Sequence, residues 1–409
     1  MKENFAGYSI ENLINTKINC ACKECHFINA ELFYGNFIKN IKLVMKNFPY
    51  SKVALICTEN SFESFGKSLI DFLKKEGIVP LSIIVNNLSD KVEDLSKLFC
   101  LPEDLRCVIT FDIDLVNALS YFAFVKQIPL IFIPTSVNVK GVFNNKIRVT
   151  VDGKEDKIKI TTKKYIIIDE KLLVAQKKDL LTAYLNALTS LVSVIDLRVN
   201  KTIFSKKLCE NCLELINNSI FAIMNNLSKK RSIKLIEEGL KLDIANNFLE
   251  DELYNSSYFA VEKVQKALGE VNNLTKITTV FALLELYKIY FSKKHENILS
   301  VPNYIEDIEE LSKITNQNEI DLLRRVKENL PNFFEFENKL KKHNAKLLKK
   351  INAILKRKRK FVKIFNALLE ETETVDYELI KKSIYYAPYF MENYTTLSLL
   401  REKGILENL

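Results

Sequence analysis

Residues 107–143 read CVITFDIDLVNALSYFAFVKQIPLIFIPTSVNVKGVF, and this stretch decides the fold class. It opens with the apolar run Cys107–Phe111, continues with an amphipathic stretch over Asp112–Lys126, and ends in a second apolar run at Leu130–Ile133. Short runs that are apolar on both faces are typical of strands in parallel sheets, because helices cover both sides of such sheets. The stretch therefore predicts a strand–helix–strand unit of a parallel sheet.

The same alternation of strand and helix continues on both sides, from residue 30 to residue 170. Further strands are predicted at Glu31–Tyr34, Lys52–Cys57, Leu81–Val85 and Tyr165–Ile168. Further helices are predicted at Phe37–Asn47, Ser61–Glu76 and Ser89–Phe99. Two runs of alternating polarity, Lys146–Val151 and Lys157–Thr161, flank the turn sequence Val-Asp-Gly-Lys. They predict an antiparallel hairpin that is added to the sheet.

The pattern changes after about residue 170. Only three glycines remain, no proline occurs between Pro134 and Pro302, and apolar residues recur every three or four positions almost to the end. We therefore expect an α/β domain over residues 1–172 and an all-helical domain over residues 173–409. A chain of 409 residues is also too long for a single hydrophobic core, which agrees with two domains.

The composition excludes several classes of protein. Apolar residues make up 47% and charged residues 27% of the chain, which is typical of a soluble globular protein. Glycine is scarce, at 9 of 409 residues against an average share of about 7%. No two glycines have the spacing of a GxGxxG motif or a phosphate-binding P-loop. The chain has no tryptophan and only three histidines, and so few histidines disfavour an active site built on histidine.

The sequence also carries expectations about the cellular compartment. No apolar run reaches 18 residues, so we expect no membrane span. The N-terminal sequence MKENFAGYSIENLIN lacks the basic flank and apolar block of a secretion signal. Eight cysteines in so long a chain do not suggest a disulfide scaffold. We expect a cytoplasmic protein with reduced thiols.

The net charge of +9 is concentrated in one segment, which we call the basic arm, Lys339–Lys363. This arm holds twelve Lys and Arg residues and no acidic residue, so removing its charges leaves −3 for the rest of the chain. The spacing of its apolar residues predicts a helix with one packed face and a solvated lysine face. The alternative is a surface for an anionic partner or nucleic acid.

The order of these segments resembles the glycerol-1-phosphate dehydrogenases, which belong to the superfamily of dehydroquinate synthase and iron-containing alcohol dehydrogenases. The likeness is carried by residues 107–143, where Pro134-Thr135 and Gly141 are in register with the family pattern, and by Cys57–Ser61 with Gly66. Further matching segments are Cys20–His26, Tyr165–Asp169, Ala183–Leu197, Tyr385–Ala387 and Asn393–Leu397. Together they cover nearly the whole chain.

The resemblance implies a fold and a chemistry. The fold is a Rossmann-type parallel-sheet domain followed by a helical domain that holds the substrate and a metal. The chemistry is the NAD(P)H-dependent, metal-assisted interconversion of dihydroxyacetone phosphate and glycerol 1-phosphate. By resemblance, the cofactor cleft is lined by Thr58, Asn60, Thr135 and Ser136.

The cofactor turn departs from the family pattern. Where the family has a glycine-rich turn for the pyrophosphate, this chain has Phe111-Asp112-Ile113-Asp114. Side chains with a Cβ block the approach of phosphate to the backbone N–H groups, and two carboxylates repel it. A simpler interpretation is that Asp112 caps the helix that follows. In either case the turn is not a pyrophosphate site, and the family's Asp-Gly pair is altered to Lys140-Gly141.

The metal positions depart as well. The family holds its catalytic metal with one Asp and two His, and these positions fall at or beside Asn186, Val261 and Thr275. No histidine occurs between His26 and His295, so a shift in the alignment cannot supply one. Valine has no lone pair, and a neutral amide is a weak ligand for a divalent ion. We therefore expect no metal and no catalytic residue at these positions.

Two groups of cysteines offer another metal site. Cys20, Cys22, Cys25 and His26 fall within seven residues, and Cys209-Glu210-Asn211-Cys212 adds a CxxC pair. Their spacing is more crowded than in structural zinc loops, so thiols without a metal are the alternative.

The sequence leads to one main hypothesis and two alternatives. The main hypothesis is a degenerate, non-catalytic relative of glycerol-1-phosphate dehydrogenase that acts as a binding or partner subunit, as a homo-oligomer or with a catalytic paralog. The first alternative is an active oxidoreductase that uses NAD(P)H and a divalent metal. The second is an anion- or nucleic-acid-binding module that works through the basic arm.

Overall fold

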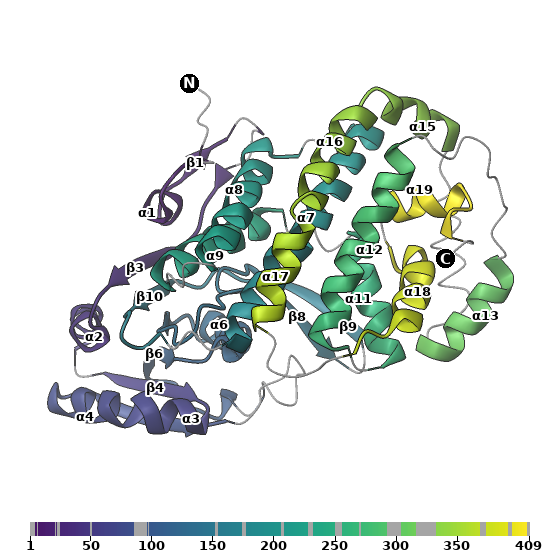
Figure 1. The fold of residues 1–409 in the computed structure, drawn as a ribbon. Coiled ribbons are helices and arrows are strands. Elements are labelled where there is room, and N and C mark those ends of the chain that lie inside the picture. Colours follow the sequence, from purple (N-terminus) through teal and green to yellow (C-terminus); the bar gives the residue numbers. More distant parts are fainter. Residues whose placement is uncertain are drawn as a thin grey trace. The chain divides into compact units, whose positions relative to one another are not determined.

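The structure is a computed structural model of the 409-residue chain (Figure 1). It describes all residues except 1–4, 6, 21, 23–24, 50, 86–95, 97, 152–153, 174–176, 206–207, 228–231, 250–255, 270, 293–303, 316–332, 369–373, 392–394 and 407–409. His295, Asn393, Tyr394 and most of the helix predicted at Ser89–Phe99 lie outside the described residues. The described chain forms two compact units. One comprises residues 1–183 and 214–248, and the other comprises residues 184–213 and 249–409.

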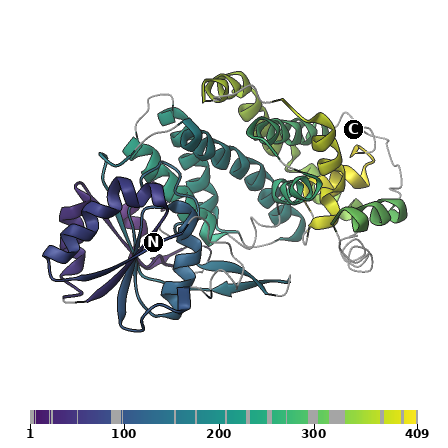
Figure 2. The same cartoon turned by 90° about the horizontal axis from the view of Figure 1, so that it is seen from below.

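The first unit is built on a six-stranded parallel sheet (Figure 2). Its strand order is β3-β10-β7-β6-β4-β5. The strands are β3 (Ala30–Tyr34), β4 (Lys52–Cys57), β5 (Val79–Ile84), β6 (Leu105–Thr110), β7 (Leu130–Phe132) and β10 (Lys164–Ile168). All five neighbouring pairs are parallel. The predicted fold class is confirmed, because the apolar runs of the sequence are the strands of this sheet.

Helices connect the strands of this sheet. They are α2 (Phe37–Met45), the short α3 (Glu59–Ser61), a π-helical turn at Phe62–Gly66, α4 (Lys67–Lys75), a 3-10 turn at Ile113–Leu115 and α6 (Val116–Val125). The apolar faces of α2 and α4 share one core with the central strands, in which Val53, Leu55, Ile109 and Ile131 are fully buried. Burial of this kind, at about 25 cal/mol per Å² of apolar surface, is the main driving force for the unit.

The expected hairpin forms, but it is not part of the main sheet. β8 (Lys146–Val151) and β9 (Lys154–Lys159) pair only with each other, in a separate antiparallel sheet. The prediction of an added hairpin is therefore wrong. The physical reason lies in α6, because Ala118 packs with Ile147 and Ile160 in a small apolar cluster of its own. The hairpin buries its apolar face on the helix and needs no strand partner in the sheet.

A second small hairpin, which the sequence pattern did not predict, lies near the N-terminus. After α1 (Ile10–Leu13), β1 (Ile18–Asn19) pairs antiparallel with β2 (Cys25–His26). The first unit is completed by α9 (Ser232–Phe248), which contacts α1.

Two helices continue from one unit into the other. They are α7 (Lys177–Phe204) and α8 (Glu210–Leu227). By length and mean hydropathy α7 is apolar enough to span a membrane, but 78% of its apolar window is buried inside the protein, as in the core helix of a globular fold.

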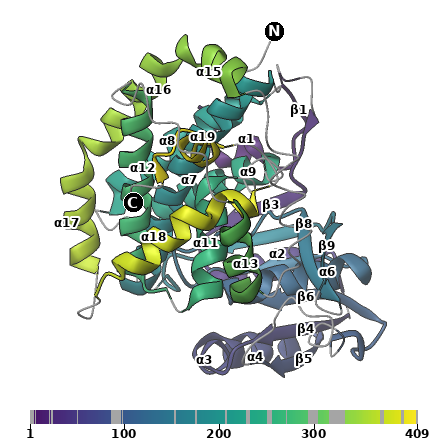
Figure 3. The same ribbon diagram turned by 90° about the vertical axis from the view of Figure 1, so that its right-hand side faces the viewer.

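The described residues of the second unit form helices and the loops between them, with no strand (Figure 3). Its helices are α11 (Ser257–Leu268), α12 (Asn273–Phe291), α13 (Tyr304–Thr315), α15 (Phe333–Lys341), α16 (Asn344–Leu355), α17 (Lys358–Leu368), α18 (Tyr377–Tyr386), a 3-10 turn at Ala387–Phe390 and α19 (Thr396–Glu402).

The basic arm is not one helix, as predicted, but three. It runs from the end of α15 through α16 and into α17, with breaks near Lys342 and Lys356 (Figures 1 and 3). The second break falls in the run of basic residues 356–360, where like charges three and four positions apart destabilise a continuous helix. The packed face is confirmed, because Leu347, Ile351 and Phe361 are buried and α16 contacts α12.

Candidate functional site

The carboxyl ends of β4 and β6 lie at one edge of the sheet, because these strands are parallel neighbours. The Asp112 carboxylate, just after β6, accepts hydrogen bonds from the Thr58 backbone N–H at 2.8 Å, the Thr58 hydroxyl at 3.0 Å and the Ser61 hydroxyl at 2.6 Å. Thr58 is the N-cap of α3, so the carboxylate sits at a helix N-terminus, where unpaired N–H groups favour an anion. The chain thus supplies its own anion at this edge.

This arrangement corrects the simpler interpretation of Asp112. The side chain makes no capping hydrogen bond to the 3-10 turn that follows it. It binds instead across the sheet edge, to residues 51 and 54 positions earlier in the chain.

The backbone of the turn at residues 111–114 has no left-handed residue. Among the described non-glycine residues, positive φ angles occur at Asn15, Gln127 and Ser205. The ring of Phe111 is 1% exposed and packs against Phe37 and Phe65, with ring centroids at 6.2 and 5.6 Å. The turn is therefore anchored in the core by an aromatic side chain and has an ordinary backbone.

The four cleft residues named from the family resemblance lie at the same edge. Thr58 and Asn60 follow β4, whereas Thr135 and Ser136 follow β7, and β6 lies between these two strands. Asn60 is exposed, and the other three are half-buried. The Ser136 hydroxyl accepts a hydrogen bond from the Asn138 N–H at 3.2 Å, so it helps to shape its own loop.

The sequence did not reveal a buried charged pair beneath the loop of Gly141. Asp243, on α9, accepts hydrogen bonds from the N–H groups of Gly141 at 2.6 Å and Phe143 at 2.7 Å. The Lys164 ammonium donates to the Val142 carbonyl. Burial raises the pKa of Asp243 to about 6 and lowers the pKa of Lys164 to about 8. Gly141 has a φ of 91°, which the loop requires at this position.

The three positions at which the sequence resemblance puts the family's metal ligands do not carry side chains that suit a divalent ion. Asn186 lies on α7, Val261 on α11 and Thr275 on α12. Val261 and Thr275 are 0% and 1% exposed. The Thr275 hydroxyl accepts a hydrogen bond from the Asp376 N–H at 3.3 Å, so it already has a structural partner. One amide, one hydroxyl and one methyl-bearing side chain are not a ligand set for iron, zinc or nickel.

A buried carboxylate does lie on α7, but it serves the fold. Asp196 accepts hydrogen bonds from the backbone N–H groups of Ser257 at 2.8 Å and Thr396 at 3.2 Å, which begin α11 and α19. The Tyr287 hydroxyl donates to both of its oxygens, at 3.0 and 3.1 Å. Burial raises the pKa of Asp196 above that of an ordinary carboxyl. Both oxygens are therefore committed to holding helices together.

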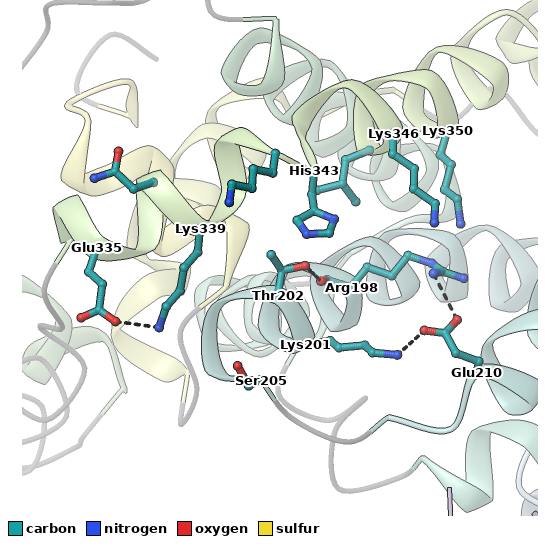
Figure 4. A pocket seen from close by; sticks show the side chains of 13 residues that line it. Arg198, Lys201, Thr202, Ser205, Glu210, Glu335, Lys339, His343, Lys346 and Lys350 are labelled. Carbon is teal, nitrogen blue, oxygen red and sulfur yellow. Dashed lines mark hydrogen bonds and ion pairs between the residues drawn. The ribbon is translucent and has the colours of Figure 1, made fainter. Parts of the chain in front are cut away.

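The second unit contains a cavity of about 750 Å³ lined by basic side chains, which we call the basic pocket (Figure 4). Its lining includes the charged residues Arg198, Lys201, Glu210, Glu335, Lys339, Lys342, Lys346 and Lys350, and also His343. Six lysine or arginine side chains thus face two glutamates. The cavity combines the end of α7 with α15 and α16, which hold the first half of the basic arm.

Part of this positive charge is neutralised within the pocket. Glu210 pairs with Arg198 and Lys201, and Glu335 pairs with Lys339 at 2.7 Å. Lys346 and Lys350 point from α16 toward Arg198 (Figure 4). Burial, together with the nearby charges of Arg198 and Lys346, lowers the pKa of Lys350 to about 8. These like charges repel one another, and a bound anion would relieve the repulsion.

Individual known proteins are similar to this chain, although no profile of a known protein family matches it. A glycerol-1-phosphate dehydrogenase [NAD(P)+] of Bacillus licheniformis is 21% identical over 387 residues, which cover 89% of this chain and 86% of that protein.

Several solved structures with a similar fold are dehydrogenases. An alcohol dehydrogenase of an archaeon from a Red Sea brine pool has a TM-score of 0.52 at 10% identity, with 94% of this chain and 98% of that chain covered. An iron-containing alcohol dehydrogenase of Thermotoga maritima has a TM-score of 0.51 at 11% identity, with 94% and 99% covered. The resemblance expected from the sequence is confirmed: the chain has the fold of the iron-containing alcohol dehydrogenases and resembles glycerol-1-phosphate dehydrogenase over most of its length.

Proposed function

We propose that this chain is a non-catalytic relative of the glycerol-1-phosphate dehydrogenases and acts as a binding or partner subunit. The observation that carries the proposal is the Asp112 carboxylate at the N-terminus of α3, bonded to Thr58 and Ser61. This edge of the sheet is where the family resemblance locates the dinucleotide. The donors that a pyrophosphate needs there are already taken.

Electrostatic repulsion also opposes the binding of a dinucleotide at this edge. A carboxylate and a phosphate charge about 4 Å apart repel each other by roughly 4 kcal/mol near a protein surface. The Asp114 side chain, which is exposed two residues further on, contributes a second negative charge to the same turn. Binding of NADH or NADPH at this edge would have to displace Asp112 or overcome the repulsion.

The reaction would also lack its metal. In the chemistry that the resemblance implies, a metal acts as a Lewis acid and polarises the substrate carbonyl. Asn186, Val261 and Thr275 supply no ligand set for it. Among the described residues, some His, Cys, Asp or Glu side chains do lie close enough together to hold a metal ion. None of them lies beside Asn186, Val261 or Thr275.

The alternative is an active NAD(P)H-dependent oxidoreductase, and one assay separates it from the main proposal. Dihydroxyacetone phosphate reduction is followed through the loss of NADH or NADPH absorbance, with Zn²⁺, Ni²⁺ or Fe²⁺ added. We expect no turnover above background. Measurable turnover by the unmodified chain would establish the alternative and end the non-catalytic proposal.

Cofactor binding is tested separately by titration of NADH or NADPH, monitored by fluorescence. We expect no saturation below millimolar cofactor. The Asp112→Gly variant removes the competing carboxylate and should bind the dinucleotide more tightly than the unmodified chain. Asp114→Gly is the comparison variant: it removes the second charge of the turn but leaves the hydrogen bonds of Asp112 in place, so its gain in dinucleotide binding should be smaller. Saturation of the unmodified chain at micromolar cofactor would contradict the proposal.

The basic pocket supports a second function, the binding of a compact, multiply charged anion. A concave cavity suits such an anion better than a nucleic acid, which contacts phosphates along an extended surface. Calorimetric titration with pyrophosphate should show saturable binding that weakens with salt. The Lys346→Gln/Lys350→Gln variant should lose it, whereas Lys349→Gln should keep it, because Lys349 is exposed and does not line the cavity. Equal binding by all three proteins would refute this function.

As a partner subunit, the protein would pair with a second copy of itself or with a catalytic paralog in the cytoplasm. Light scattering of the purified chain measures the first possibility. Co-expression with an active dehydrogenase of the same fold, followed by co-purification through a tag on one chain, measures the second. If the chain is strictly monomeric and captures no such dehydrogenase, the partner role is excluded and only the binding role is left.

A further inference from the structure

The N-terminal hairpin brings soft metal ligands together. Cys20 directly follows β1, Cys22 lies in the turn, and His26 ends β2. The antiparallel register pairs Ile18 with His26. Residues that are crowded in the sequence are thus distributed over both arms and the turn of the hairpin, so that their side chains can point to a common centre.

The distances fit a metal centre. The sulfurs of Cys20 and Cys22 and a ring nitrogen of His26 all lie within 4.8 Å of one another. The Cys22 sulfur lies 3.3 Å from His26 Nε2. Ligands of a tetrahedral zinc ion, with Zn–S near 2.3 Å and Zn–N near 2.0 Å, are roughly 3.5–4 Å apart, so only a small contraction is needed.

The His26 side chain is buried and held in place by aromatic rings. His26 is 4% exposed. Its ring lies between Phe5, with centroids 5.6 Å apart, and Phe248 of α9, with centroids 4.5 Å apart. These contacts fix the ring plane and exclude water. A buried imidazole whose nitrogen faces a thiol has a good partner in a metal ion, because the neutral ring and the thiolate are both preferred zinc ligands.

We propose that Cys20, Cys22 and His26 bind a zinc ion that cross-links the N-terminal hairpin. Two thiolates balance the charge of Zn²⁺, and a third thiolate of the chain completes the four-coordinate site. The sequence offers Cys25, Cys209 and Cys212 for that position. The site is independent of the proposed function, because it uses none of the residues at the sheet edge or in the basic pocket.

The test is the metal content of the full-length protein, purified without chelators under reducing conditions. Elemental analysis should find about one zinc per chain. The Cys20→Ser/Cys22→Ser variant should lose it, and so should His26→Asn. Cys100→Ser is the matched control, because Cys100 is an exposed thiol outside the cluster and its loss should leave the zinc in place. Zinc retained by the double variant, or absent from the unmodified protein even after zinc is added back, would overturn the proposal.

A second measurement holds even if the variants fold poorly. Cobalt added to the unmodified, metal-free protein should give the charge-transfer absorption of thiolate ligands, and zinc should abolish it. Alkylation followed by mass spectrometry should show Cys20 and Cys22 protected by zinc and reactive after chelation. A Cys20–Cys22 disulfide in the fresh protein would contradict the site. Single variants of Cys25, Cys209 and Cys212 identify the third thiolate, and unchanged zinc affinity in all three would refute four-coordination by the chain.

Discussion

At the scale of single residues, Asp112 shows how one carboxylate can join the ends of two neighbouring strands. The sequence predicts that the turn is unsuited to a phosphate, because no glycine is present, and cofactor titration is the test of this prediction. It does not predict the partners of Asp112, because they lie 51 and 54 residues earlier and meet it only through the pairing of β4 with β6. Long-range polar pairs of this kind leave no local pattern. The same holds for Asp243 and Lys164.

Removing the Asp112 carboxylate should destabilise the fold, although it also removes a negative charge from this edge of the sheet. Asp112→Ala leaves the buried hydroxyl of Ser61, the half-buried hydroxyl of Thr58 and the Thr58 backbone N–H without this acceptor, which costs about 1–3 kcal/mol. Urea denaturation measures this loss, and Asp114→Ala should lie within about 0.5 kcal/mol of the unmodified chain. If the two variants proved equally stable, the hydrogen bonds of Asp112 would not matter to the fold.

Asp243 should give the stability a specific pH dependence. Its pKa is about 6 in the folded protein and 3.8 in an unfolded chain, so the folded state binds more protons between pH 4 and 6. The contribution to stability is therefore present below about pH 4 and is lost as the pH rises through 6, by about 3 kcal/mol in total. The difference in unfolding free energy between the unmodified chain and Asp243→Asn should change in this direction across that window. A constant difference would show that the carboxyl titrates normally.

At the scale of secondary-structure elements, the sequence predicted the strands well and the hairpins poorly. Lys52–Cys57 was located without error, because a continuous apolar run bounded by polar residues defines a buried strand. β1 and β2 have only two residues each, too few for any periodicity. The β8–β9 hairpin was recognised, but its partner was not, because the choice between a sheet edge and α6 depends on tertiary packing.

Introducing a metal-ligating residue into α11 or α12 should destabilise the second unit. Val261 and Thr275 are packed in the interior of the second unit, and Thr275 also binds the Asp376 N–H. A histidine in place of Val261 must bury a larger, polar ring, which costs roughly 2–4 kcal/mol. Thermal unfolding of Val261→His should show this loss. Val264→His, on the same helix and equally buried, is the matched control for size, and zinc should rescue neither variant. Rescue of Val261→His alone would mean that a metal site survives at this position.

At the scale of the whole molecule, the two groups of residues on which the non-catalytic proposal rests lie in different compact units. Asp112 and its partners belong to residues 1–183, whereas Asn186, Val261 and Thr275 belong to the helical unit. Each unit keeps a well-packed core around its altered positions.

Restoring one unit at a time should not restore turnover. Asn186→Asp returns one carboxylate, but a catalytic metal needs about three protein ligands and an open position. Glycines in place of Phe111, Asp112, Ile113 and Asp114 remove the competing carboxylate, yet they leave no Lewis acid to polarise a carbonyl. They also delete the Phe111 ring from the core, so binding must be compared with that of Asp112→Gly, which keeps the ring. The expected pattern is a gain in dinucleotide binding for Asp112→Gly, no gain for Asn186→Asp, and background reduction of dihydroxyacetone phosphate by every variant with Zn²⁺, Ni²⁺ or Fe²⁺ present. Turnover that appears with Asn186→Asp alone would show that the sheet edge still accepts the cofactor, and the carboxylate of Asp112 would then have to be reassigned as a part of its binding site.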